Sequence, residues 1–402
     1  MSLTNYQEHF DNAYEDIFQK ALVAKVIMNT RFESKLKFGE SVERFIYDVS
    51  NVRVRTVVRG SASTIDTISD STELITINLE KEAVFHISDG EATQAGPLNP
   101  GEVIGGQIGL KVAIDLDARC FYEVLSALYD FDNGDLTGLA STAAGITLNS
   151  TTVPQLVTRA PAKLRRVNNQ EIMTNMCFVV DSYAAADIAQ YLLGKNIDLA
   201  GSVFKNGYTG DVSNAEMYVS ENLTGEAVLY LPQTPSDGDT VLIGGVTFTF
   251  KTTLTTTPGA VLISGSADAA RANLVALVNA PGTTTTFGTA LSTANQLILT
   301  DSLQIVATND NTADTMNIKG TGSGRLILAG TLTNTNNTWS KNWIHCYFGK
   351  KGAIDLVIQD MKKVDMRKTD DRRGTNVFSS YLAGIKTFAD GAKKFLDVLI
   401  NA

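Results

Sequence analysis

Histidines and cysteines are the residues of this 402-residue chain best suited to catalysis or metal binding, and there are three of each. A Ser-His-Asp or Cys-His site needs a base within hydrogen-bond reach of a nucleophile, and zinc ligands follow short fixed spacings. No two histidines share a local motif, and the cysteines lie far apart among apolar residues. We therefore expect no zinc site, and buried free thiols in a reducing compartment. The residues are His9, His86, His345, Cys120, Cys177 and Cys346.

Two short runs superficially suggest ligand binding. "GTGSGR" (320–325) is rich in glycine like a phosphate-binding loop, but it lacks the Lys-Ser/Thr ending and no apolar strand leads into it. "NDNTAD" (309–314) carries Asp310 and Asp314 without the glycine and terminal glutamate of a calcium loop. Both runs favour ordinary turns between strands. The sequence gives no positive sign of an enzyme and no cofactor-binding motif.

Two groups of charged residues are better candidates for protein contacts. Asp115 and Asp117 fall in a long helical pattern, where residues two apart point to different sides, so we interpret them as its solvated or interface face. The run "DMRKTDDRRG" mixes both signs of charge within ten residues, which suits a subunit contact as well as a plain charged loop. Its candidate contact residues are Arg367, Asp370, Asp371, Arg372 and Arg373.

Composition places the chain among large, mildly acidic globular proteins. Hydrophobic residues make up 44% and charged residues 19%, with a net charge of -9, so a large core in two or three domains is expected. Dedicated nucleic-acid binding is disfavoured because it needs clustered Lys and Arg. There is no leader pattern and no apolar run long enough to cross a bilayer. A soluble protein made in a cytoplasm is the expectation.

The first hundred residues predict an amphipathic helix and a projecting ribbon. Apolar residues between Tyr6 and Met28 recur at helical spacing. In "ERFIYDVSNVRVRTVVRG", alternating runs on both sides of Ser50-Asn51 predict a two-stranded ribbon with a charged face that carries Arg53, Arg55 and Arg59. A polar tip and two further strand-like runs, "LITINLE" and "AVFHIS", follow. A ribbon this polar is expected to lie across another surface, because it has too little apolar area for its own core.

The middle of the chain gives the clearest helical pattern. Residues 102–129 place apolar side chains on one broad stripe. The strand "NMCFVV" then leads into a helix that Asp181 or Ser182 can cap and that Gly194 can end. A short strand, Glu216 to Ser220, comes next. At the end of the chain, "GAIDLVIQDMKKVDMRKTDDRRGTNVF" gives two strands around a charged turn, and further short strands or a helical turn close the sequence.

Between these parts lies a segment of different composition. Residues 224–342 contain 12 charged residues in 119, against 65 in the other 283, and 25 threonines. "DGDTVLIGGVTFTFKTT" predicts a hairpin, and Ser266 can cap a short helix. "QLILTD", "LQIVAT" and "RLILAG" are strand-like. Because the apolar residues are patterned, we expect a small, independently folding α+β or β-rich domain.

The order of these elements resembles the major capsid proteins of tailed bacteriophages, the Hong Kong 97-type fold. The resemblance is carried by "VFKNGYTGDVSNAEMYVSENL" (203–223) and by the closing segment "YFGKKGAIDLVIQDMKKVDMRKTDDRRGTNVFSSYLAGIK". It covers residues 1–223 and 341–402. The Thr-rich segment is additional to the minimal fold, and no residues match those that would support covalent cross-linking between lysine and asparagine.

The resemblance implies an α+β fold with five parts. These are an N-terminal arm (1–35), an extended β loop (36–80), a peripheral domain with a long spine helix (81–150, completed by 353–379), an axial domain (151–223, completed by 342–352 and 380–402) and an inserted domain (224–341). Arg53, Arg55, Arg59, Asp115 and Asp117 would then lie at subunit contacts, together with the charged cluster of 367–373.

The implied function is self-assembly of many copies into an icosahedral shell around phage DNA. Its partners would be other copies in hexamers and pentamers, together with scaffolding, portal or decoration proteins. Packaged DNA would be contacted only non-specifically, and no membrane or cofactor is implied. The location would be the virion, after synthesis in a bacterial cytoplasm. The alternative is a phage tail or surface adhesion component whose Thr-rich domain binds a carbohydrate.

Overall fold

The structure is a computed structural model and describes residues 22–32, 40–48, 52–56, 59–60, 65–88, 100–138, 142, 144–167, 174–193, 208–212, 215–322, 324–368 and 374–402. Helices and strands are mixed along the chain, so the fold belongs to the α+β class, as expected. The chain divides into two compact units. Unit 1 comprises 1–15, 28–108 and 352–392, and unit 2 comprises 16–27, 109–351 and 393–402.

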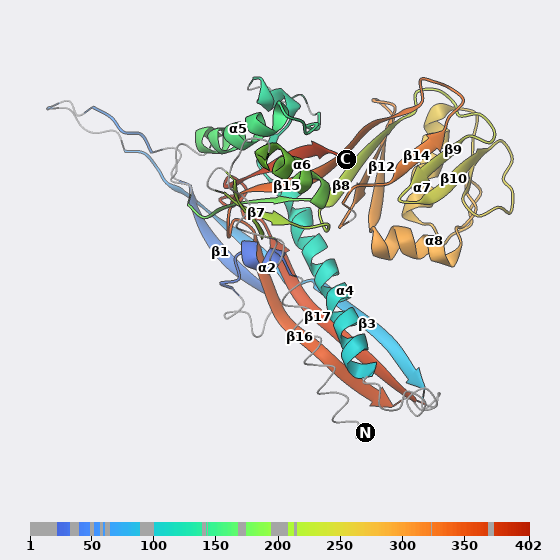
Figure 1. Ribbon diagram of the computed structural model, residues 1–402, viewed down its shortest axis with the longest axis horizontal. Coiled ribbons are helices and arrows are strands. Elements are labelled where there is room, and N and C mark those ends of the chain that lie inside the picture. Colours follow the sequence, from blue (N-terminus) through green and yellow to red (C-terminus); the bar gives the residue numbers. More distant parts are fainter. Residues whose placement is uncertain are drawn as a thin grey trace. The chain divides into compact units, whose positions relative to one another are not determined.

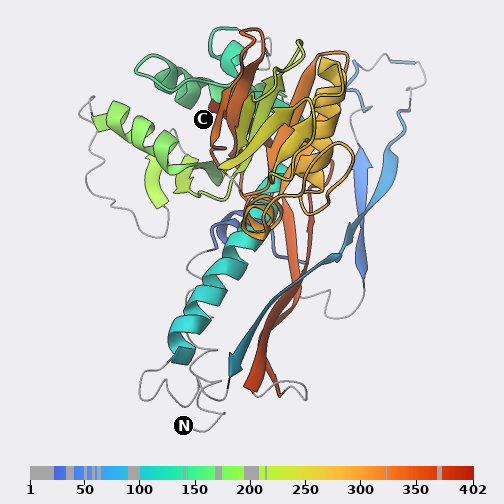
Figure 2. The same cartoon turned by 90° about the vertical axis from the view of Figure 1, so that its right-hand side faces the viewer.

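Unit 1 is built on long antiparallel strands. A three-stranded sheet has the order β16-β17-β3, and β1 pairs with β2 in a separate two-stranded ribbon (Figures 1 and 2). The predicted pair of strands near the end of the chain is confirmed as β16 and β17, while the turn at 369–373 lies outside the described residues. The strands are β1 (Ser41–Asp48), β2 (Ser69–Thr76), β3 (Leu79–Ser88), β16 (Asp355–Lys368) and β17 (Gly374–Lys386).

The predicted ribbon exists, but its second strand differs from the expected one. β1 pairs in register with Ser69–Thr76, and not with the "VRVRTVV" run that follows Ser50-Asn51. Residues 52–56 and 65–68 have no assigned strand partner and continue beyond the paired part (Figure 1). The ribbon's base is anchored in a small apolar cluster that contains Ile75, Val357 and Phe388. Ribbon pairing therefore includes 69–73, the end of the polar run that the sequence predicts as the tip.

Unit 2 contains a nine-stranded sheet whose central strand is β15 (Thr338–Lys350). The main order is β12-β13-β8-β15-β5-β7-β6, and β18 pairs with β15 and β4. β8 and β5 follow one another along one edge of β15, while β18 lies along the other edge. The remaining strands are β4 (Tyr129–Phe131), β5 (Met176–Val180), β6 (Tyr208–Val212), β7 (Ala215–Val219), β8 (Thr224–Tyr230), β12 (Ile305–Asp310), β13 (Thr315–Gly320) and β18 (Phe395–Asn401).

The centre of this sheet is buried on both faces, which explains its near-continuous apolar runs. All five residues of β5 are buried, as are seven successive residues of β15. Aromatic pairs fill the space between strands: Phe178 meets Phe348 edge-on, and Tyr347 stacks on Phe395 at 4.9 Å between ring centroids. Gly349 lies beside Phe395, where a side chain would overlap the β18 backbone. This close approach fixes the spacing of β15 and β18.

Helices precede and flank the strands. The predicted long helix is present as α4 (Pro100–Tyr122), but it ends earlier than expected, because 123–126 form a 3-10 turn (η1) and Tyr129 begins β4. The strand-to-helix unit at β5 and α6 (Ser182–Leu193) is confirmed, and Asp181 accepts the Ala184 N–H as its cap. The others are α2 (Ala24–Ile27), a 3-10 turn η2 (Asn133–Leu136) and α5 (Thr152–Val167). Most of the predicted N-terminal helix lies outside the described residues.

The Thr-rich segment builds a core from its own residues. A four-stranded sheet with the order β11-β10-β9-β14 packs with helix α7 around buried side chains between 227 and 326. The predicted hairpin is confirmed as β9 and β10, joined at Gly244-Gly245, both with positive φ as a tight two-residue hairpin turn requires. Ser266 caps α7, as predicted. The elements are β9 (Thr240–Ile243), β10 (Val246–Lys251), β11 (Ala260–Leu262), α7 (Ala267–Asn279), α8 (Thr293–Leu297), a π-helical turn η3 (Ile298–Ser302) and β14 (Leu328–Thr331).

One expectation for this segment is wrong. "QLILTD" is helical, formed by the end of α8 and η3, because Ser292 caps a helix immediately before it by accepting the Asn295 N–H. "LQIVAT" contributes most of β12 and "RLILAG" the start of β14, as expected for strands. The core also holds the fully buried Arg271, which donates to the Leu231 carbonyl at 2.7 Å and to Asp268 at 2.5 Å. A carboxylate of the same helix and the carbonyl that follows β8 thus compensate for its buried charge.

Candidate subunit-contact surfaces

The β1–β2 ribbon presents two different faces. Val42, Arg44 and Ile75 point to the side that packs on unit 1, where Arg44 pairs with Asp390 at 2.6 Å and lies over the ring of Phe388. The opposite face carries Phe45 and Leu74, which are 61% and 55% exposed. They are diagonal neighbours in the register, because Phe45 lies opposite Thr72. An apolar surface on a ribbon with no core beneath that face is typical of a protein contact.

The exposed apolar character continues along the ribbon. Val52, Val54, Ile65 and Ile68 are all at least half exposed. These residues belong to the extended segments beyond the paired strands. With Phe45 and Leu74 they form what we call the ribbon patch. Sequence reasoning identified the ribbon and its lack of a core of its own, but it emphasised the arginines and did not single out these exposed apolar residues.

Of the three predicted arginines, Arg53 and Arg55 contact one carboxylate within the ribbon. Arg55 forms a bidentate ion pair with Asp66, at 2.7 and 2.6 Å, and the backbone N–H of Arg53 donates to the same carboxylate. The Arg55 hydrogen bonds and the Arg53 N–H lower the pKa of Asp66. Arg59 is exposed at a turn with Gly60. The structure thus places the Arg53 backbone and Arg55 side chain on one carboxylate, where they hold 52–56 and 65–68 together.

The two aspartates of the long helix have separate roles. Asp115 is half-buried and pairs with Arg119 at 3.1 Å, and it also accepts from the Gln304 amide at 2.6 Å. Asp117 is fully buried, which corrects the interpretation that it lies on a solvated or interface face. It accepts the N–H groups of Val23 and Ala24, both at 3.0 Å, and so holds the start of α2. Burial raises its pKa to about 7.

The mixed-charge cluster is described only in part. Arg367 is exposed at the end of β16, with its guanidinium 5.4 Å from the ring centroid of Phe378. Asp370, Asp371, Arg372 and Arg373 lie outside the described residues. The cluster's role in subunit contacts stays a prediction.

The histidines and cysteines form no common site among the described residues. His86 contacts Asn376 across the β3–β17 pair, and His9 lies outside the described part of the chain. All three cysteines are buried free thiols, as predicted, and burial raises the pKa of each. Within the described ranges, no group of three or more His, Cys, Asp or Glu side chains could hold a metal ion, and no helix is long and apolar enough to span a membrane.

His345 is the centre of a buried charge cluster in the sheet. Its Nδ1 lies 2.7 Å from Asp397 on β18, and its Nε2 lies 3.1 Å from Glu226 on β8. Burial alone would lower the pKa of His345, but the two carboxylates outweigh it and raise the value to about 9. The ring is therefore protonated in the folded protein at neutral pH, and it links three strands by charge-assisted bonds.

This cluster predicts a stability loss in mild alkali. Because the folded-state pKa of His345 exceeds its ordinary value of 6.5, its stabilisation is complete below about pH 6.5 and disappears as the pH rises through about 9. We expect the unfolding free energy to fall by an amount on the order of 2 kcal/mol between pH 7 and 9. Denaturant titrations across this range will measure it, with His345→Gln as the comparison. If the unfolding free energy of the wild type and of His345→Gln changed equally with pH, the raised pKa would not belong to His345.

The comparisons with known proteins add a structural likeness. No protein-family model matches the chain, and no curated protein matches it in sequence. Among solved structures, one from Mycobacterium phage Che8 is similar with 13% identity and a TM-score of 0.46, over 94% of this chain and 91% of that chain. The capsid of cyanophage P-SCSP1u is similar with 13% identity and a TM-score of 0.45, over 91% and 85%. The chain is similar to phage capsid structures over nearly its whole length.

The likeness extends beyond phages. A virus-like particle from Pyrococcus furiosus is similar with 12% identity and a TM-score of 0.41, over 98% of this chain and 99% of that chain. The chain therefore spans almost the full length of that structure and most of the two phage chains.

Proposed function

We propose that this protein is a major capsid protein, many copies of which assemble into the icosahedral shell of a tailed bacteriophage. The observation that carries the proposal is the ribbon patch, an apolar surface on a two-stranded projection that has no core beneath it. A two-stranded ribbon is at best marginally stable alone, so such a surface favours burial against another molecule. In a shell, that molecule is a neighbouring copy.

The sequence resemblance supports the same role. The axial-type run at 203–223 and the closing segment carry it, and β16 and β17 now form the paired strands expected from the latter. Capsid is also the role printed for the cyanophage structure reported above, and the proposal brings that role to this chain. The mild net negative charge of -9 suits a wall that encloses DNA without gripping it. The place of action would be the virion.

The proposal is tested by assembly of the purified full-length chain. Size-exclusion chromatography and negative-stain microscopy should show capsomer-sized rings, tubes or closed shells at high protein concentration. A chain that stays monomeric at high concentration, in low and high salt and with candidate scaffolding partners, would contradict it.

We further propose the Hong Kong 97-type arrangement, with residues 224–341 as an inserted domain. The strand on which the chain enters this segment pairs with the strand on which it leaves, because Thr224 lies opposite His345 in the β8–β15 ladder. A chain that returns to its starting point can carry extra residues without disturbing the strands that flank it. The segment's own apolar core supports independence. The arm, extended loop, peripheral domain and axial domain keep the boundaries given above as proposals.

The insertion predicts that an excised fragment folds by itself. Residues 224–345 keep the whole β8–β15 pairing together with the core cluster, and we expect them to unfold in one cooperative transition. Circular dichroism melting and amide proton NMR dispersion will measure this. Because Arg271 is fully buried in that core, an Arg271→Ala fragment should lose the transition. A disordered wild-type fragment would show that the segment depends on the rest of the chain.

A further inference from the structure

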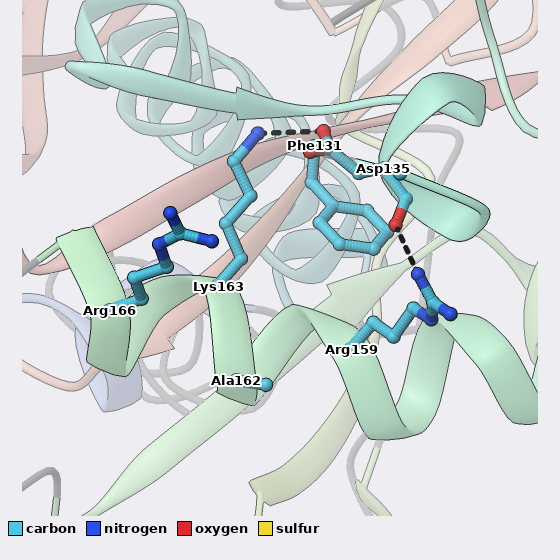
Figure 3. A pocket seen from close by; sticks show the side chains of 7 residues that line it. Phe131, Asp135, Arg159, Ala162, Lys163 and Arg166 are labelled. Carbon is cyan, nitrogen blue, oxygen red and sulfur yellow. Dashed lines mark hydrogen bonds and ion pairs between the residues drawn. The ribbon is translucent and has the colours of Figure 1, made fainter. Parts of the chain in front are cut away.

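A cavity of about 250 Å³ lies between α5 and the segment that includes β4 and η2, all within unit 2. Arg159, Ala162, Lys163 and Arg166 line it from one face of α5, where residues three and four apart are neighbours. The fully buried Phe131 lines it from β4. In the view of Figure 3, the Phe131 ring lies between the side chains of Lys163 and Arg159, and Arg166 lies on the other side of Lys163.

The cations of this cavity are only partly compensated. Lys163 is committed to the protein, since its ammonium group donates to Asp135 at 2.6 Å and to the Asp130 carbonyl at 2.5 Å. Arg159 makes one long contact of 3.5 Å with the Asp135 carbonyl. Arg166 has no hydrogen bond or ion pair to any described residue, and its side chain is exposed. Two guanidinium groups therefore retain most of their donors for a ligand.

The charge of α5 stands out against the rest of the chain. Thr152–Val167 contains two cations besides Arg159 and Lys163, namely Arg165 and Arg166, and no acidic residue, whereas the whole chain has a net charge of -9. Such a face attracts an anionic group, and paired guanidinium groups suit the planar oxygens of a carboxylate or a phosphate.

Asp135 distinguishes between these two kinds of anion. Its side chain lines the cavity, is 2% exposed, and has one oxygen, Oδ1, without a hydrogen-bond partner among the described residues. A buried acceptor needs a donor, and leaving it unpaired costs free energy. A phosphodiester backbone brings only acceptors. A peptide brings a carboxylate for the arginines together with backbone N–H donors.

We propose that this cavity binds an Asp or Glu side chain, with an adjoining backbone N–H, from an acidic segment of a second copy of this chain. The second copy as the source rests on the proposed shell function and on the acidity of the chain as a whole. The carboxylate would bind between Arg159 and Arg166, with the Phe131 ring as the floor and the Lys163–Asp135 pair holding that floor in place.

A titration of the full-length chain, kept dilute so that it does not assemble, tests the ligand class. The probe is a fluorescein-labelled, end-capped hexapeptide with two adjacent glutamates, and the control probe carries glutamines instead. We expect the glutamate peptide to bind and the glutamine peptide not to bind. Arg159→Ala and Arg166→Ala should each weaken binding about tenfold. Arg165→Ala, an exposed cation on the same helix that does not line the cavity, should leave it unchanged.

Three outcomes would overturn the ligand assignment. The first is no binding of the glutamate peptide. The second is that Arg165→Ala weakens peptide binding as much as Arg159→Ala and Arg166→Ala do. The peptide would then bind to the basic face of α5 in general. The third is that a short oligothymidylate binds more tightly than the glutamate peptide, through Arg159 and Arg166. That result would make the ligand a nucleic-acid phosphate. Melting curves of the variants, which change only exposed side chains, will confirm that each one is folded.

Sedimentation at assembling concentration tests the source of the carboxylate. If wild-type protein assembles and the Arg159→Ala, Arg166→Ala double variant assembles poorly, the second copy is supported. If both assemble equally although the double variant has lost peptide binding, another protein supplies the carboxylate and the second copy is wrong. If wild-type protein does not assemble at all, the proposed function fails and the second copy fails with it. The peptide titration alone then decides the cavity's chemistry.

Discussion

Replacing Phe45 and Leu74 together by aspartate is expected to abolish assembly while the chain stays folded. Both side chains are more than half exposed in the single chain, so the substitutions remove no intramolecular core contact. In a shell, the ribbon patch would be buried against a neighbour, and two unpaired carboxylates there would each cost several kcal/mol. We expect association to weaken by at least about 100-fold. Sedimentation velocity and negative-stain microscopy will measure it.

The control is a double variant with the same change of charge on exposed apolar residues elsewhere. Leu297→Asp with Ile327→Asp alters two exposed side chains of the Thr-rich segment. That variant should assemble like the wild type, because the segment is proposed to be an insertion. If the ribbon variant assembles normally, the ribbon patch is not a subunit contact. If both double variants fail, added negative charge alone is responsible.

Replacing Gly349 by alanine is expected to destabilise the central sheet strongly. An added Cβ would lie 2.3 Å from the Cβ and 2.5 Å from the Cα of Phe395, so the β18 backbone would have to move. That movement would disturb the Tyr347–Phe395 stack and the pairing of β15 with β18. We expect a loss of about 3 kcal/mol or more, measured by denaturant titration.

Gly282→Ala is the matched control for this substitution. Its added Cβ would meet only the end of the Gln296 side chain, at 3.0 Å, and the residue is exposed. A flexible side chain can yield, so the change should stay within about 1 kcal/mol. If Gly349→Ala does not accumulate in soluble form, the soluble fraction relative to Gly282→Ala serves as the measure. Equal stability of the two variants would contradict the close packing of β15 and β18.

Much of the fold could be predicted because it depends on local signals. The pattern of β5 followed by α6, the Ser266 cap and the β9–β10 hairpin are each set by residues within a few positions of one another. The strands β16 and β17 are long, alternating and separated by a short charged run, so their pairing was also readable from the sequence.

The partner of β1 could not be predicted in the same way. The run after Ser50-Asn51 alternates as a strand should, but alternation does not choose between two possible partners. The choice is made by Ile75, which is fully buried in the small cluster with Val357 and Phe388. Those residues lie about three hundred positions further along the chain, and a single sequence does not reveal such distant contacts.

The buried Asp117 did leave a signal, and it was misread. On a helix, Asp117 shares its face with Ala113 and Phe121, four residues away on each side, and both are buried. A charged residue within an apolar stripe indicates a buried, hydrogen-bonded group. Its partners, the N–H groups at the start of α2, could not be identified because they lie more than ninety residues earlier.

The proposed contact surface was predicted only in outline. The sequence identified the ribbon and its arginines, and the structure shows Arg55 satisfied within the ribbon by Asp66. The exposed Phe45 and Leu74 were indistinguishable from core residues, because a strand's apolar face reads the same whether its cover comes from its own chain or another. The basic face of α5 was visible in "TRAPAKLRR", but the cavity beside it required the fold.

Strand β15 has a mechanical consequence for the protein. Its first half is bonded to β8 beside the Thr-rich core, and its second half is bonded to β5 and β18 in the central sheet. A force that pulls the Thr-rich segment away along the strand direction would load these hydrogen bonds together, in shear, and they would have to break at once rather than one after another. The attachment of the segment should therefore resist a pulling force along the strand direction better than one that separates the strands one hydrogen bond at a time.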